Sequence, residues 1–287
     1  MVTTPLPTAT PVPQLVPSWF ADVDVRAGGG SGADAIGFPV PSGGPVPAEL
    51  EADLGELERA GFSPAVGSAL AEPRHGGPAL VAVGLGEAGA LTAAAVRDAA
   101  AAFARSVPRD GALAFLVPSS AAVPPDEAAA AVVEGVLLAR HRFDLRSTPR
   151  ASDAVPVSSL VLVAPGGADD AVAAGAARGL VTARAAMMSR DLATCPAVLL
   201  TAEAIAQVAV EVGGPVGLEV EVTDRDGLVA LGCGGLLGVN RGSANEPRMV
   251  RLTYTPAGEP TGHLGLVGKG IMYDAGGISL KPSDESH

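Results

Sequence analysis

Residues 78–118 read PALVAVGLGEAGALTAAAVRDAAAAFARSVPRDGALAFLVP, and this stretch decides the fold class. Two apolar runs, residues 78–86 and 111–118, are rich in valine and leucine and have the length of buried strands. Between them, residues 91–107 are rich in alanine and have helical spacing. The order strand, helix, strand predicts a parallel or mixed sheet with helices on its faces.

Further segments extend this α/β pattern on both sides. Residues 34–40 (DAIGFPV) and 158–165 (SSLVLVAP) are apolar and of strand length. Residues 126–145 have the alanine content and spacing of another helix. We therefore predict one α/β domain over residues 19–165.

A long alanine-rich helix is expected next, and we interpret residues 166–192 as the connector between two domains. The second domain, residues 193–287, begins with a short helix at 201–212 that Thr201 can cap. Strands are expected at residues 216–224, 248–256 and 263–271. Because fewer than about 100 residues make a thin domain, this second α/β domain is expected to be incomplete.

The amino-terminal residues 1–18 contain five prolines and no basic residue. They lack the charged start and apolar stretch of a signal peptide, so we expect a flexible, extended lead. No apolar run approaches the roughly 18 residues that a membrane-spanning helix needs, so no membrane partner is expected.

Composition restricts the partners and the compartment. The chain has 19 basic and 31 acidic residues, a net charge of −12, and no cluster of Lys and Arg, so nucleic acid is an unexpected partner. Its two cysteines, Cys195 and Cys233, are far apart and lack metal-ligand spacing. We expect two buried thiols in a reducing, cytoplasmic environment.

Gly84, Gly86 and Gly89 form a G-x-G-x-x-G pattern after a predicted strand, as in dinucleotide-binding folds. That motif needs an acidic residue at the end of the next strand, whereas Asp110 precedes the next strand here. A tight turn between strand and helix explains the glycines equally well, so no nucleotide cofactor is expected.

The carboxy-terminal segment GLVGKGIMYDAGGISLKPSDE places Lys269, Asp274 and Lys281 in a glycine-rich stretch after a hydrophobic run. A phosphate-contacting loop and an ordinary turn with Asp at its start are both compatible with these residues. A metal site is the third interpretation. A carboxylate can bridge hard cations, and a lysine close to such cations can lose its proton and become a ligand.

Residues 268–283, GKGIMYDAGGISLKPS, resemble the metal-binding signature of the cytosolic leucyl aminopeptidases, G-K-G-[ILV]-T-[FY]-D-[ST]-G-G-[ILV]-x-[ILV]-K-P. Met272 and Ala275 are the departures, and neither position is a metal ligand in the family. SRDLATCPAVLLTAEAIAQVA (189–209) and LGCGGLLGVNRGSANEPRMVRLTY (231–254) are similar to family segments at the same spacing. More loosely, residues 78–102 and 133–145 resemble the family's amino-terminal domain.

The resemblance implies a macro-like amino-terminal α/β domain joined by the long helix to a catalytic α/β domain. It implies two divalent metal ions, Mn or Zn, with Lys269 a ligand of one metal and Asp274 in contact with both. Lys281 would be the catalytic cation that faces the scissile carbonyl. Peptide substrates with a preference for amino-terminal leucine, and a hexamer, are implied in the same way.

One departure concerns the ligand set. The family supplies an Asp about a dozen residues beyond the second lysine, and later an Asp-x-Glu-x-Arg cluster, which this sequence does not contain. Two hard cations need several carboxylates. We therefore expect the 287-residue chain to lack turnover by itself. The alternative is a non-catalytic module for oligomerisation or ligand binding, with the glycine-rich residues 28–32 as one candidate loop.

Overall fold

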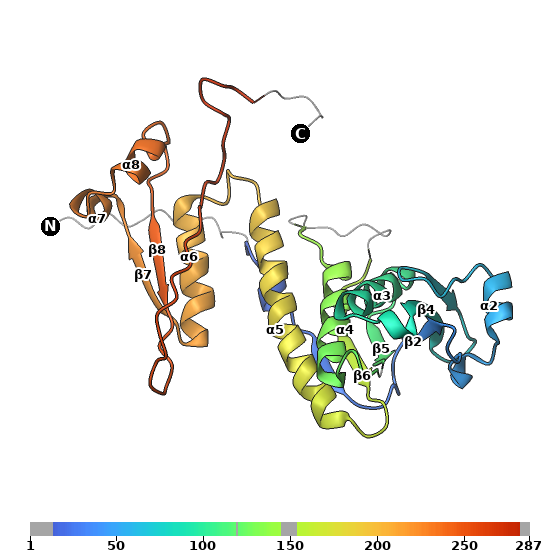
Figure 1. Cartoon of the computed structure of the whole chain (residues 1–287). Helices are drawn as coiled ribbons and strands as arrows, with labels where there is room; N and C mark the ends of the chain where they lie inside the picture. Colours follow the sequence, from blue (N-terminus) through green and yellow to red (C-terminus); the bar gives the residue numbers. More distant parts are fainter. Residues whose placement is uncertain (1–13, 119, 145–153, 282–287) are drawn as a thin grey trace. The chain divides into compact units, whose positions relative to one another are not determined.

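The computed structural model describes residues 14–118, 120–144 and 154–281. The chain divides into two compact units, one from Pro17 to Asp191 and the other from residues 1–16 and 192–287. We call them the amino-terminal unit and the carboxy-terminal unit, and each is described by itself (Figure 1). Most of the expected proline-rich lead lies outside the described residues. At its described end, Leu15 and Val16 are buried and α1 (Pro17–Phe20) is helical.

The amino-terminal unit contains a six-stranded sheet in the order β1-β6-β5-β2-β4-β3. Its strands are β1 (Asp24–Ala27), β2 (Ala35–Ser42), β3 (Ala69–Glu72), β4 (Ala79–Glu87), β5 (Ala112–Leu116) and β6 (Ser159–Val163). Only the pair β3–β4 is antiparallel, and the other neighbours are parallel. The prediction of a mixed α/β sheet is confirmed.

Helices α3 (Ala93–Ser106), α4 (Pro125–Arg140) and α5 (Asp169–Thr194) contribute to the larger core, which lies on one face of this sheet. Small aliphatic residues dominate that core, and Phe103 and Phe115 meet edge to face at 5.4 Å between ring centres. A smaller cluster on the opposite face packs β2 and β4 against α2 (Leu54–Arg59) and the short helix Ala48–Leu50. The helix expected to connect the domains belongs to the amino-terminal unit as far as Asp191.

Glycines bring α3, α4 and α5 into backbone contact. A Cβ atom added at Gly135 of α4 would lie 2.2 Å from the Arg97 carbonyl oxygen of α3. One added at Gly175 of α5 would lie 2.0 Å from the Asp126 carbonyl oxygen, and one at Gly179 would lie 2.6 Å from that of Ala130. Real Cβ atoms are essentially never found within 3.0 Å of such atoms, so no larger residue fits at these crossings.

Gly175→Ala should destabilise the amino-terminal unit by about 1–3 kcal/mol, because overpacking outweighs the gain of about 1 kcal/mol from replacing Gly in a helix. Urea unfolding followed by circular dichroism measures the difference. Gly89→Ala is the control, since a Cβ there meets nothing within 4 Å. A Gly175→Ala protein as stable as the control would contradict the close crossing.

The carboxy-terminal unit is built from α6 (Ala202–Gly213), β7 (Glu219–Thr223), α7 (Arg225–Ala230), α8 (Gly234–Asn240) and β8 (Met249–Thr253). β7 and β8 pair antiparallel, and Val220 and Leu252 approach Gly213 at the end of α6. The predicted strand at residues 263–271 is wrong, because residues 254–281 contain neither helix nor strand. Leu264, Leu266 and Val267 are 86%, 88% and 100% exposed, so no neighbouring strand covers them.

The two cysteines differ from the expectation of two buried thiols. Cys195 is buried, whereas Cys233 is half-buried at the start of α8. Among the described residues, no helix is long and apolar enough to cross a membrane.

Candidate functional site

Asp274 and Lys281, two of the three predicted site residues, are in direct contact in the carboxy-terminal unit. Lys281 Nζ lies 3.0 Å from Asp274 Oδ2. The other carboxylate oxygen, Oδ1, accepts a hydrogen bond of 2.9 Å from the Gly276 backbone N–H. Both oxygens of Asp274 are therefore engaged within a seven-residue span of the chain.

The glycine pair of the motif makes this contact possible. The backbone N–H of Lys281 donates to the Ala275 carbonyl at 2.9 Å, which closes a turn. Gly276 and Gly277 have φ of +90° and +63°, in the region that favours glycine. A Cβ at Gly276 would also lie 2.1 Å from the Ser279 carbonyl oxygen. The two glycines of the motif therefore let the chain turn back, so that Lys281 reaches Asp274.

Charge around Asp274 keeps it ionised. The Gly276 N–H and then the hydrogen bond and charge of Lys281 hold the pKa of the Asp274 carboxyl below its usual value, and Lys269 adds a weaker attraction. A lowered pKa stabilises the folded form above the ordinary carboxyl pKa, and this contribution is lost as the pH falls through the lowered value. Because Asp274 is fully exposed, solvent screens the effect strongly.

The donor set suits part of a divalent metal site. Asp274 supplies an ionised oxygen donor of the kind hard cations prefer, and Lys269 supplies an amine. Within residues 14–118, 120–144 and 154–281, no three His, Cys, Asp or Glu side chains gather closely enough to hold a metal ion.

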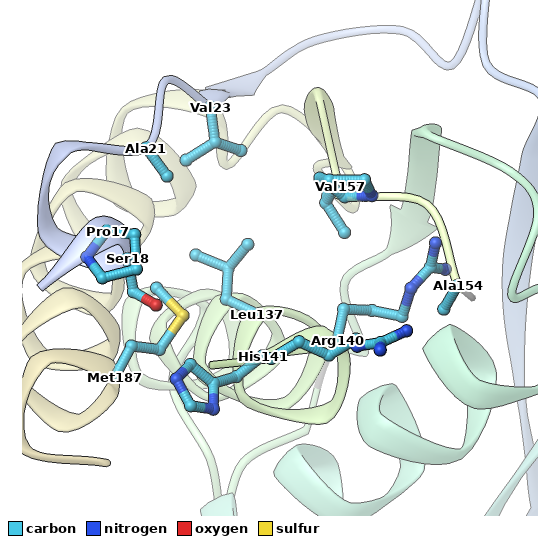
Figure 2. Close-up of a pocket in the computed structure, with 12 residues that line it drawn as sticks. Pro17, Ser18, Ala21, Val23, Leu137, Arg140, His141, Ala154, Val157 and Met187 are labelled. Carbon is cyan, nitrogen blue, oxygen red and sulfur yellow. The ribbon is translucent and has the colours of Figure 1, made fainter. Parts of the chain in front are cut away.

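A second polar centre, in the amino-terminal unit, was missed by the sequence analysis. Asp191 is completely buried and accepts hydrogen bonds from Ser18 N at 2.9 Å and Ser18 Oγ at 3.1 Å. His141 Nε2 lies 2.8 Å from Asp191 Oδ1. Ser18 and His141 line a cavity of 260 Å³ together with aliphatic side chains such as Leu137 (Figure 2).

This trio is a structural tie rather than a nucleophile. Serine and histidine both bond to the carboxylate instead of to one another, so the histidine is not placed to activate the serine. The tie joins α1 to the ends of α4 and α5, and Ser18 and Asp191 lie where the chain enters and leaves the unit. In the sequence, Asp191 is one of several charged residues in an alanine-rich helix, so its buried hydrogen bonds could not be predicted.

Arg140 lines this cavity and binds backbone carbonyls at the carboxyl end of α3. Its guanidinium donates to the carbonyls of Ala104, Val107 and Pro108 at 2.9–3.2 Å, and also to those of Asp110 and Val155. Burial lowers the pKa of Arg140. Burial also raises the pKa of Asp110, to which Asp34 adds, while Arg140 opposes the rise.

The G-x-G-x-x-G pattern serves the fold. A Cβ at Gly84, inside β4, would lie 2.1 Å from the Ala65 carbonyl oxygen, and Gly86 has φ of +78°. Gly84 is needed for close packing, and Gly86, inside β4, lies at the register irregularity between β4 and β2. The tight turn expected from the sequence is therefore not the role of Gly86. Asp110 lies before β5, as the sequence indicated, and not at a nucleotide-contacting strand end.

Asp191→Ala should lower the free energy of unfolding of the amino-terminal unit by about 3 kcal/mol, because it leaves buried donors of Ser18 and His141 without their acceptor. Trp19, the single tryptophan, adjoins Ser18 in α1 and reports the loss by fluorescence during urea unfolding. Asp24→Ala is the matched control, since it removes an exposed pair with Arg26 and should cost less than about 1 kcal/mol. Equal losses of unfolding free energy in the two variants would show that the hydrogen bonds of Asp191 stabilise the unit no more than an exposed ion pair does.

The mixed sheet and the helices on it define an α/β protein, and solved structures share this fold. The structure titled "Bottromycin maturation enzyme BotP in complex with Mn" has a TM-score of 0.73 and 38% sequence identity, covering 89% of this chain and 52% of that one. A tomato leucine aminopeptidase mutant (K354E) has a TM-score of 0.71, covering 95% of this chain and 57% of that one. At 19% identity, the tomato enzyme supports the fold alone.

Family models identify the chain more closely. Residues 48–149 match the amino-terminal domain of the cytosol aminopeptidase family, and residues 187–287 match its catalytic domain. The chain belongs to the cytosol aminopeptidase family.

Curated relatives agree with this assignment. A probable cytosol aminopeptidase of Chlorobaculum tepidum is 40% identical over 166 residues, which are 55% of this chain and 33% of the relative. One from Streptomyces griseus is 37% identical over 223 residues, which are 72% of this chain and 42% of the relative. The chain thus spans a third to a half of the length of such relatives.

Proposed function

We propose that the protein to which these residues belong is a metal-dependent aminopeptidase that removes amino-terminal residues from peptides, with leucine preferred. The observation that carries the proposal is the Asp274 carboxylate, held ionised by Gly276 and Lys281 within a motif of the family's catalytic domain. An exposed carboxylate with a lowered pKa is ionised near neutral pH, which suits cation binding and not proton transfer.

The three motif residues have separate roles in this proposal. Asp274 would bind both cations and Lys269 one of them, while Lys281 would place a positive charge where the carbonyl oxygen becomes negative. Two bound divalent ions, Mn or Zn, would supply an activated water and polarise the peptide carbonyl. The BotP structure in complex with Mn supports manganese as the first ion to test.

The contact between Lys281 and Asp274 would have to change if a metal bound. Lys281 Nζ lies 3.0 Å from Asp274 Oδ2, so this amine would have to move aside for that oxygen to bind a cation. The freed ammonium group would then face the substrate from the same turn. The Gly276 N–H can keep its bond to Oδ1 and so hold the carboxylate in place.

The setting of the activity is also part of the proposal. A cytoplasmic location is supported by the names of the relatives, which are cytosol aminopeptidases. Peptide substrates and a hexamer are proposed on the same ground, the resemblance to this family.

The alternative is a non-catalytic module with residues 28–32 as its candidate ligand loop. Gly30 of this loop packs on the sheet, whereas Gly29 and Gly32 have open space around them. A Cβ at Gly30 would be in contact with Ile36, Ala114 and Val163.

The roles predict different outcomes for three substitutions in the natural full-length protein. Asp274→Ala should abolish leucine-anilide hydrolysis together with metal occupancy, because it removes the shared carboxylate. Lys281→Ala should keep both metals and lower kcat by about 10²–10³, the usual cost of one electrostatic donor. Lys269→Ala should weaken one metal more than the other. Metal analysis beside the kinetics separates them, and loss of metal in Lys281→Ala with retention in Asp274→Ala would refute these roles.

The 287-residue chain itself should bind Mn²⁺ weakly or not at all and should not hydrolyse leucine anilide, because the motif offers one carboxylate and one further ligand. Calorimetric titration with Mn²⁺ measures this. Tight binding at two sites would contradict the ligand count.

A further inference from the structure

A cavity of 220 Å³ lies in the carboxy-terminal unit, among α7, α8 and the loop that leads to β8. Its polar lining includes Arg225 from α7, Arg241 at the end of α8, and Ser243 and Asn245 from the loop. None of these residues belongs to the motif that contains Asp274. The cavity therefore needs an explanation of its own.

Among the described residues, Arg225 and Arg241 have no ion-pair partner, whereas three other cations of the same unit do. Arg248 binds Glu246 at 3.2 Å, Arg251 binds Glu221, and Lys281 binds Asp274. By contrast, the guanidinium groups of Arg225 and Arg241 make no hydrogen bond or ion pair with the part of the chain that the structure describes. Both groups therefore line one cavity with their hydrogen-bond donors available.

The loop that frames the cavity is held in shape by its own hydrogen bonds. Asn240 Nδ2 donates to the Asn245 carbonyl at 2.9 Å, and Ser243 N donates to the Asn240 carbonyl at 2.8 Å. Ser243 Oγ accepts from Asn245 N at 3.1 Å, which leaves its hydroxyl proton available to a ligand. The donors are therefore presented on a preformed frame.

Two acidic neighbours of the cavity have other partners in the described chain. Glu246 lines the cavity, but its carboxylate is engaged by Arg248. Asp224 precedes Arg225, and its side chain caps α7 by accepting from Gly227 N at 2.9 Å. Asp226 follows Arg225 but does not line the cavity.

We propose that this cavity is a binding site for a small oxyanion, a carboxylate or a phosphate group, held by Arg225 and Arg241 with Ser243 as a neutral donor. Guanidinium groups present paired N–H donors that match both kinds of group. The site is independent of the proposed peptidase activity. A peptide carboxy terminus and a phosphorylated metabolite are the two sources of such a group.

Calorimetric titrations at constant ionic strength test the site, with acetate, citrate, phosphate and pyrophosphate as probes and chloride as the balancing anion. Saturable binding that weakens roughly tenfold in both Arg225→Gln and Arg241→Gln is expected, since each removes charge-assisted hydrogen bonds. Arg251→Gln is the matched control from the same unit, because Arg251 pairs with Glu221 and does not line the cavity.

The relative affinities for the probes show whether the ligand is a carboxylate or a phosphate, and two outcomes would contradict the proposal. Preference for carboxylates identifies a peptide terminus as the ligand class, and preference for phosphates identifies a phosphorylated one. Absence of binding, or binding equally reduced by Arg251→Gln, overturns the proposal. Circular dichroism of the variants establishes that these exposed substitutions leave the fold intact.

Discussion

The packing of the amino-terminal unit depends on one constraint, the backbone contact of α4 with α3 and α5. At Gly135, Gly175 and Gly179, a single methyl group would overlap a neighbouring carbonyl or Cα atom. Because the helices approach so closely, the space between them admits small side chains, and alanine and valine fill most of it. The low aromatic content of the chain, 3%, is consistent with these close helix crossings.

The same approach brings the ends of the helices together. With α5 against α4, His141 after the end of α4 meets Asp191 near the end of α5, and Asp191 reaches Ser18. A buried carboxylate is stable there because each of its oxygens has a donor. The positions at which the chain enters and leaves the unit are therefore fixed to one another.

Local pattern predicted most of the amino-terminal unit, and the failures lie where distant segments decide. Valine-rich runs and alanine-rich helices report burial directly, so β4, α3 and β5 were predictable. The run at 263–271 also looked like a strand, but a strand requires a neighbour that periodicity does not report. The Ser18–Asp191 contact spans 173 positions, beyond any local signal. Gly175 looked like a weak helix former and gave no hint of close packing.

For the candidate site, the motif singled out Asp274 and Lys281 but did not indicate that they contact each other. The role of Lys281 toward a substrate carbonyl is a proposal, and in the structure Lys281 pairs with Asp274 across a turn in which Gly276 and Gly277 have positive φ. This pairing orients the Asp274 carboxylate and helps to keep it ionised. It also explains the order of residues in the motif, since the two glycines between Asp274 and Lys281 set the length of the turn.

Diffraction from crystals of the natural full-length protein grown with Mn²⁺, measured at the manganese absorption edge, tests the central claim most directly. The account predicts anomalous peaks at coordination distance from the Asp274 carboxylate, one of them also close to Lys269 Nζ, with Lys281 moved off Asp274. Manganese bound elsewhere, with the Lys281–Asp274 pair intact, would contradict it.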